Sequence, residues 1–242
     1  IFAENLYTML VSTITPEEVC REIKNDYTLF QERILEEGAN AHRKFIKAIL
    51  FPVMHQFSWM SPLGNKWCSI LIVRYRNERK HPGIIPYLKY ENLGMGIIYP
   101  KKIYSNISII DFRPHFWKRY RERLLIPNGL DGLSFDEQIK HFFMNSGLFT
   151  IDFRKGSNKN HEGFVGYTKT GVFFGVVLEE LDYLCVKTFV PVNMLFDGQV
   201  EQLNSADELR KKIMSHPDYF SGRGKLFHIM NNGFIYLDET NK

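Results

Sequence analysis

The chain has 242 residues, and its composition is ordinary for a folded globular protein. Hydrophobic residues make up 44% of it, charged residues 24% and aromatic residues 14%, which excludes an intrinsically disordered chain. The formal net charge of +4 is too small for a protein that coats nucleic acid, so any anion-binding role requires local clustering of cations. No apolar run approaches the roughly 20 residues of a membrane span, so no membrane is expected among the partners.

Cysteine and histidine usage limits the chemistry further. Cys20, Cys68 and Cys185 are widely spaced and form no CxxC pair, which favours a reducing compartment and a cytoplasmic location. The eight histidines form no HExxH or HxH motif and no cluster with cysteine, so we expect neither a metal site nor a cofactor. The phosphate-binding motifs GxxxxGK[ST] and GxGxxG and the hydrolase motif GxSxG do not occur either.

The first third of the chain is predicted to begin with helices and to continue as strands. Thr15 as N-cap and Glu18 three residues later form a capping box, and Gly38 is the expected end of this first helix. A second helix is expected over 41–53. From about Ser69, short apolar segments separated by Gly, Pro and Asn predict an antiparallel meander.

The second half shows a similar succession. Residues 114–125 are predicted to form a helix, and a further helix follows with Ser134 as N-cap and Glu137 as its capping-box partner. A last helix is expected after Ser205 as its N-cap, and the tail is expected to form a final strand or hairpin. Three antiparallel strands are predicted between these helices, over 163–168, 171–179 and 183–190.

Together these elements predict an α+β fold with two units. Residues 1–107 are expected to form N-terminal helices and a β-meander, a region to which the sequence assigns no role. Residues 108–242 are expected to form a helix pair with an antiparallel sheet, and this unit carries the candidate active region.

The segment HFWKRYRER, residues 115–123, concentrates the candidate chemistry. His115, Arg119 and Arg123 are spaced by four residues and form one stripe on the predicted helix, without an evident packing role. Guanidinium groups bind phosphate oxygens in a bidentate manner and histidine transfers protons near neutral pH, so this stripe suits a phosphodiester. The same pattern is also typical of an arginine-rich helix surface that is simply solvated.

The segment CVKTFVP interrupts an apolar strand with two polar side chains. The strand period of two places Thr188 on one face of the sheet, together with Val186 and Val190. It places Lys187 on the other face, together with Phe189. Either Lys187 or Thr188 therefore lies close to the core, where its polar group needs a partner that could be purely structural.

This succession resembles a known class of enzymes. A helix with His-x3-Arg-x3-Arg, a second helix and an antiparallel sheet that ends in VKTFVP is similar to the metal-independent ribonuclease toxins of the RelE/barnase/colicin-type superfamily. The resemblance covers residues 108–195, about a third of the chain, and residues 1–105 have no counterpart in these shorter toxins. It implies that the ribose 2′-hydroxyl is the nucleophile, that no metal is needed, and that RNA and a protein partner or antitoxin are the partners.

The resemblance also implies roles for individual residues. His115 would be the acid or base, and Arg119 and Arg123 would stabilise the phosphorane. Lys187 and Thr188 would complete the catalytic set from the sheet. The implied substrate-binding residues are Tyr120, Tyr167 and Lys169.

Other interpretations stay open. Barnase-like members also use a glutamate as base, and Glu162 and Glu179 are available for that role. The alternatives are a non-enzymatic protein-interaction module, in which the arginine stripe is a salt-bridged surface, and a protein of unknown function associated with a phage or mobile element. A ribonuclease requires the basic side chains to converge on one cleft, whereas an interaction module allows them to diverge and to pair with carboxylates.

Overall fold

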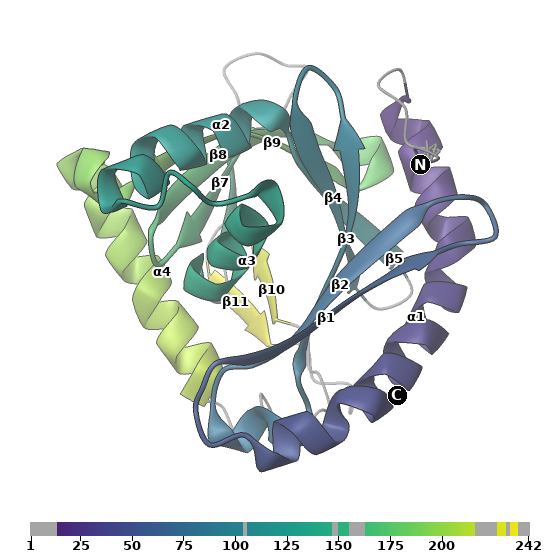
Figure 1. Cartoon of the computed structure of the whole chain (residues 1–242). Helices are drawn as coiled ribbons and strands as arrows, with labels where there is room; N and C mark the ends of the chain where they lie inside the picture. The colour runs from purple at the N-terminus through teal and green to yellow at the C-terminus, as the bar shows by residue number, and fades with distance from the viewer. Residues whose placement is uncertain are drawn as a thin grey trace. The chain divides into compact units, whose positions relative to one another are not determined.

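The computed structural model describes residues 14–103, 106–146, 150–154, 163–215, 227–230 and 233–236. The chain divides into two compact units, Ile1–Asp111 and Phe112–Lys242. Each unit combines helices with antiparallel strands, so the fold belongs to the α+β class that the sequence predicts (Figure 1).

The first unit consists of a long helix followed by a meander of strands. Its elements are α1 (Pro16–Lys47), β1 (Val53–Met60), β2 (Lys66–Val73), the 3-10 helix η1 (Arg76–Lys80), β3 (Gly83–Glu91), β4 (Met95–Ile103) and β5 (Asn106–Phe112). Strand β1 pairs with β2, β2 with β3 and β3 with β4, each in antiparallel fashion. The predicted meander is therefore confirmed.

Both predicted capping boxes are present. At the start of α1, the Thr15 amide donates to Glu18 Oε2 at 2.8 Å, and the Glu18 amide donates to Thr15 Oγ1 at 3.3 Å. Before α3 (Phe135–Ser146), the Ser134 amide donates to Glu137 Oε2 at 2.8 Å, and the Glu137 amide donates to Ser134 Oγ at 3.4 Å. Each box satisfies amides that a helix N-terminus otherwise leaves without a partner.

Helix α1 does not end where the sequence predicts. The expected stop at Gly38 and the separate helix over 41–53 are both wrong, because one helix continues to Lys47. Ile34 and Ala41 are buried on either side of the glycine. Packing of these flanking turns stabilises the helix through a residue of low helix propensity.

A buried aromatic and polar network attaches α1 to the sheet of the first unit. The ring of Phe30 stacks on Trp67 of β2, with ring centroids 4.2 Å apart. One turn earlier, the buried carboxylate of Asp26 accepts from Trp67 Nε1 at 3.0 Å and from Asn65 Nδ2 at 2.9 Å. Burial of a charged group costs free energy unless it is hydrogen-bonded, so this network fixes the position of the helix at the start of β2.

In the second unit, helices pack on four neighbouring strands in the order β9-β8-β7-β6. Its further elements are α2 (Pro114–Tyr120), which continues as a π-helical turn (Arg121–Leu125) and a 3-10 turn (Ile126–Asn128), then β6 (Thr150–Arg154), β7 (Gly163–Thr168), β8 (Gly171–Leu178), the 3-10 turn η4 (Glu179–Leu181), β9 (Tyr183–Pro191), the 3-10 turn η5 (Val192–Met194), α4 (Asp197–Ser215), β10 (Phe227–Met230) and β11 (Gly233–Tyr236). The predicted helix pair, the three central strands and the C-terminal hairpin are all present.

Helices cover both faces of these four strands. On one face Tyr120 of α2 packs on Phe189 of β9, with ring centroids 5.0 Å apart. On the other face Val172 of β8 forms an apolar cluster with Leu203 and Ala206 of α4. The α2 face is dominated by aromatic rings, namely Phe112, Phe116, Trp117, Tyr120, Phe142, Phe143, Phe173 and Phe189.

Two further elements differ from the prediction. Val53–Met60 forms strand β1. The sequence predicted instead that a helix ends at Val53 and that the strands begin near Ser69. Helix α4 starts at Asp197, so Ser205 lies inside the helix and is not its N-cap. The helix instead follows Phe196, whose amide donates to the side chain of Gln199 (Oε1) at 3.2 Å. A cap position without Ser, Thr, Asn or Asp does not stand out in a sequence.

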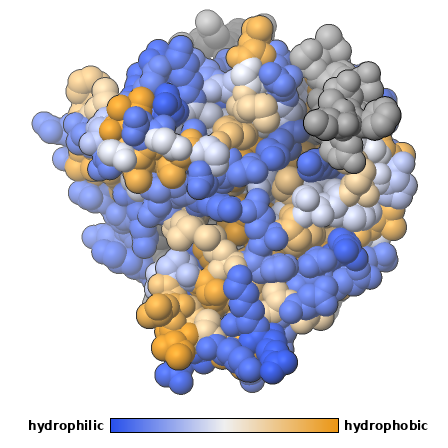
Figure 2. Space-filling view, in the orientation of Figure 1, coloured by the Kyte–Doolittle hydropathy of each residue, from blue (hydrophilic) through white to orange (hydrophobic). Residues whose placement is uncertain are grey.

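The surface and the cysteines agree with a folded globular protein. On the face viewed in Figure 2, hydrophilic side chains predominate and hydrophobic ones form small groups. All three cysteines are buried and none forms a disulfide. Within the part of the chain that the structure describes, no helix is long and apolar enough to cross a membrane.

Candidate functional site

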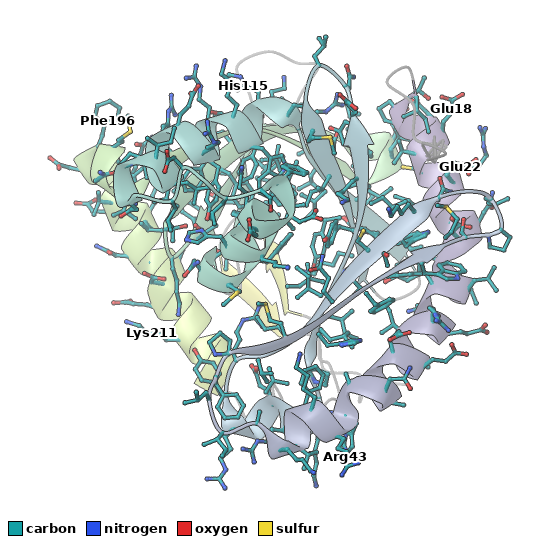
Figure 3. All side chains as sticks on the ribbon, in the orientation of Figure 1. Glu18, Glu22, Arg43, His115, Phe196 and Lys211 are labelled. Carbon is teal, nitrogen blue, oxygen red and sulfur yellow. The ribbon has the colours of Figure 1, made fainter. Side chains whose placement is uncertain are left out.

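Helix α2 displays His115 and Arg119 on the side opposite its aromatic core. Phe116 and Tyr120 are fully buried, whereas His115 is exposed and projects from the helix (Figure 3). Arg119 Nε donates to His115 Nε2 at 3.3 Å. With Nε2 as the acceptor, the neutral ring carries its proton on Nδ1. The two side chains thus form an exposed pair of a cation and a proton-transfer group.

A carboxylate of the same helix contacts this pair. Arg119 Nη1 lies 3.0 Å from Glu122 Oε2, and Lys118 Nζ lies 4.0 Å from Glu122 Oε1. These side chains are at least one-third exposed, so solvent weakens both ion pairs and an incoming anion can compete with Glu122 for the cations.

The predicted stripe of His115, Arg119 and Arg123 divides in the structure. Arg123 Nη1 donates to the main-chain oxygen of Phe189 at 2.8 Å, so this guanidinium reaches β9 and not the surface beside His115. Arg121 also has a main-chain partner, because its Nη2 donates to the oxygen of Asp131 at 3.1 Å. Only the first two members of the stripe are therefore in contact with each other.

Strand β9 carries a bulge at the polar positions. Phe174 of β8 pairs with Thr188, whereas the next residue, Gly175, pairs with Val186. Lys187 therefore has no opposite residue on β8, and its side chain is exposed. Consecutive residues of β8 point to opposite faces, so Thr188 and Val186 also lie on opposite faces. The prediction that these two share a face is wrong, because the bulge interrupts the period of two.

Thr188 and Tyr167 face helix α4 and not α2. Tyr167 belongs to the apolar cluster beneath α4, and its hydroxyl donates to Gln202 Oε1 of α4 at 3.2 Å. Thr188 is paired with Phe174, which packs against the same cluster. The sheet therefore separates both residues from His115, and the expected convergence on one cleft is wrong for them.

The other two predicted substrate-binding residues occupy different environments. Tyr120 is fully buried, and its hydroxyl lies 2.8 Å from His141 Nδ1 of α3. Its ring is therefore part of the core, which contradicts the predicted substrate-binding role of Tyr120. Lys169 is exposed in the turn between β7 and β8, where the buried hydroxyl of Thr168 accepts from the amides of Thr170 and Gly171.

The pair of Tyr120 and His141 is a polar contact beside α2 that the sequence did not reveal. Burial raises the pKa of the Tyr120 hydroxyl and lowers the pKa of the His141 imidazole. Both groups are thus neutral at neutral pH, and the hydroxyl donates to Nδ1. No sequence signal connects them, because they lie 21 residues apart on different helices.

The remaining candidates add no further group to the site. Glu162 lies outside the described residues, as does the side chain of Glu179. Among the residues that the structure describes, no group of three or more His, Cys, Asp or Glu side chains could hold a metal ion. No family model matches the chain, and no curated protein or solved structure is significantly similar to it.

Proposed function

We propose that the second unit binds RNA through the outer face of α2 and cleaves its phosphodiester backbone without a metal. The proposal is based on the 3.3 Å contact between Arg119 Nε and the exposed His115 Nε2. A phosphate oxygen bound by this guanidinium lies within reach of the imidazole, so both groups act on the same phosphodiester. The exposed side chain of Lys118, which contacts the same Glu122 as Arg119, adds positive charge beside the pair.

In the proposed reaction the substrate supplies its own nucleophile. When Arg119 turns to bind the phosphate, its Nε releases His115 Nε2. Nε2 then accepts the proton of the ribose 2′-hydroxyl, the 2′-oxygen bonds to phosphorus, and the bond to the 5′-oxygen breaks. The leaving 5′-oxygen takes a proton from the imidazolium, and the products are a 2′,3′-cyclic phosphate and a 5′-hydroxyl. Arg119 stabilises the negative charge on the five-coordinate phosphorus. Lys187, exposed at the bulge of β9, is a further candidate contact for the RNA backbone.

The cellular setting follows from the resemblance to ribonuclease toxins. A toxin of this type acts on RNA in the cytoplasm, is held inactive by a protein antitoxin, and arrests growth when it is expressed alone. The buried, unbridged cysteines support a reducing compartment.

The test uses the full chain and a single-stranded RNA oligonucleotide, without added metal ions. We expect binding that weakens steeply as salt rises, and fragments that end in a 2′,3′-cyclic phosphate. His115→Ala is expected to slow cleavage by about 10²–10⁴-fold, while His42→Ala, which removes an exposed histidine of α1, is the matched control. Unchanged cleavage by folded His115→Ala contradicts the catalytic assignment, as does cleavage at a nucleotide that lacks its 2′-hydroxyl.

A second candidate function is a protein-interaction module. The observation that favours it is that Glu122 contacts both Lys118 and Arg119, which suits a salt-bridged helix surface. This function predicts that the full chain has no salt-dependent affinity for RNA and that Arg119→Ala leaves RNA binding unchanged. The same binding titration therefore separates the two functions.

A further inference from the structure

The end of α1 and the turn that follows it expose large aliphatic side chains. Ile46 is 39% exposed, Ile49 is 87% exposed and Leu50 is 85% exposed. Single exposed hydrophobic residues are common, but adjacent aliphatic residues at this level of exposure mark a surface that contacts something apolar. None of the residues that the structure describes covers Ile49 or Leu50.

Cations surround these aliphatic residues on two elements. Arg43 and Lys47 lie three residues before and one residue after Ile46, so all three share one side of α1, and Figure 3 shows Arg43 at this end of the helix. The 3-10 helix η1 supplies Arg76 and Lys80, whose side chains are exposed. We call this surface the basic tip; its members are Arg43, Ile46, Lys47, Ile49, Leu50, Arg76 and Lys80.

Two specific contacts hold η1 beside the end of α1. Arg79 Nη2 donates to the main-chain oxygen of Ala48, immediately after the helix. The guanidinium of Arg79 also lies over the ring of Phe51, 5.3 Å from its centroid. The cations of η1 and the aliphatic residues of the turn are therefore parts of one surface.

The cations of the basic tip have no carboxylate partner among the residues that the structure describes. The carboxylates of α1 that come before the tip, Glu36 and Glu37, pair with Arg33. Glu78 of η1 is buried and accepts from the Arg74 amide at 2.6 Å. Lysine at a helix C-terminus complements the helix dipole, but this does not account for the cations of η1 or for the exposed aliphatic residues.

We propose that the basic tip docks on membranes that carry anionic phospholipids. Ile46, Ile49 and Leu50 would enter the boundary between headgroups and acyl chains, and the four cations would contact headgroup phosphates. RNA fits this surface less well, because single-stranded RNA stacks on aromatic rings and the tip exposes aliphatic residues. Attachment at the membrane surface needs no membrane-spanning helix, and the inference does not depend on the function proposed for the second unit.

The test measures co-sedimentation of the full chain with vesicles. We expect binding to vesicles of phosphatidylcholine plus phosphatidylserine, about fivefold weakening for each cation removed, and loss of binding at high salt. The variant Ile49→Ser/Leu50→Ser is expected to weaken binding at least tenfold. Leu35→Ser removes an aliphatic side chain that is 74% exposed on α1, outside the basic tip, and is the matched control.

Four outcomes overturn the proposal. They are no binding to the anionic vesicles, equal binding to vesicles of phosphatidylcholine alone, full binding by Ile49→Ser/Leu50→Ser, and equal weakening by the Leu35→Ser control. If the protein does not bind vesicles and Ile49→Ser/Leu50→Ser weakens RNA binding instead, the basic tip is an RNA-binding surface. Circular dichroism of each variant verifies that the helix content is unchanged, which is expected because these side chains are exposed.

Discussion

Arg123 Nη1 donates to the main-chain oxygen of Phe189 across a distance of 2.8 Å. The ring of Phe189 is fully buried and packs on Tyr120, which lies three residues before Arg123. One turn of helix thus supplies both a ring contact and a charged hydrogen bond to the same residue of β9. Arg123 consequently stabilises the fold, whereas Arg119 stays at the surface beside His115.

This division predicts opposite effects for two arginine substitutions. Arg123→Ala is expected to lower the free energy of unfolding by about 1–2 kcal/mol, because the oxygen of Phe189 loses a charged donor. Its RNA affinity per folded molecule should not change. Arg119→Ala should weaken RNA binding and leave the free energy of unfolding within about 0.5 kcal/mol, because surface ion pairs contribute little. Urea unfolding measures the stability and fluorescence anisotropy measures the RNA affinity. The assignment is contradicted if Arg119→Ala destabilises the fold while Arg123→Ala weakens RNA binding.

The hydrogen bond between Tyr120 and His141 predicts a dependence of stability on pH. Tyr120→Phe removes the bond without a change in packing and should cost about 1 kcal/mol at pH values above the ordinary histidine pKa. Burial lowers the pKa of His141 from its ordinary 6.5, so the unfolded chain takes up this proton first as the pH falls. The stability due to the neutral imidazole is therefore present above pH 6.5 and is lost as the pH drops towards the folded-state pKa.

His141→Gln provides the control for that pH effect. Its free energy of unfolding should vary less between neutral and mildly acidic pH than that of the parent chain, because the titrating group is gone. Equal slopes for both proteins, measured by urea unfolding across this range, would show that His141 does not contribute.

The capping box of α3 predicts a second pH dependence, at lower pH. Hydrogen bonds from Ser134 lower the pKa of Glu137 below its ordinary 4.5. The folded state therefore prefers the ionised carboxylate, and this stabilisation is present above pH 4.5 and lost as the pH falls through the folded-state pKa. Glu137→Gln should lower the melting temperature at neutral pH, and the difference from the parent chain should vanish in acid. Glu208→Gln, at an exposed position of α4, should show no such convergence.

Two glycines predict opposite responses to alanine. A Cβ at Gly175 would overlap the main-chain oxygen of Cys185 and the ring of Phe164, so Gly175→Ala should cost about 3 kcal/mol. A Cβ at Gly38 would meet no atom within 4 Å, and this glycine lies inside α1. Gly38→Ala should therefore stabilise the chain by about 0.5–1 kcal/mol. Urea unfolding measures both changes, and a Gly175→Ala variant as stable as the parent chain would contradict the packing of β8 against β9.

Local patterns predicted much of the second unit. Strand β7 has the predicted bounds, and β8 and β9 each differ from them by one residue at one end. The capping box of Ser134 and Glu137 also follows from four consecutive residues. These features depend on turn residues and side-chain spacing within a short segment, so they can be predicted without knowledge of tertiary contacts.

The errors have a common physical origin in non-local packing. Gly38 has the low helix propensity of a stop, yet α1 continues because Ile34 and Ala41 are buried on both sides of it. Strand β1 was missed because its identity depends on pairing with β2, from Val53 opposite Val73 to Met60 opposite Lys66. Propensity is a weak signal wherever such contacts outweigh it.

For the candidate site, the sequence by itself determined the pairing of His115 with Arg119, because residues four apart on a helix are neighbours. Only the tertiary structure decided that Arg123 is bound to β9 and that Thr188 faces α4. The bulge at Lys187 adds one residue to β9, and this reverses the face of Thr188 relative to Val186. A strand sequence cannot reveal such a reversal, because the bulge is defined by the pairing with the neighbouring strand.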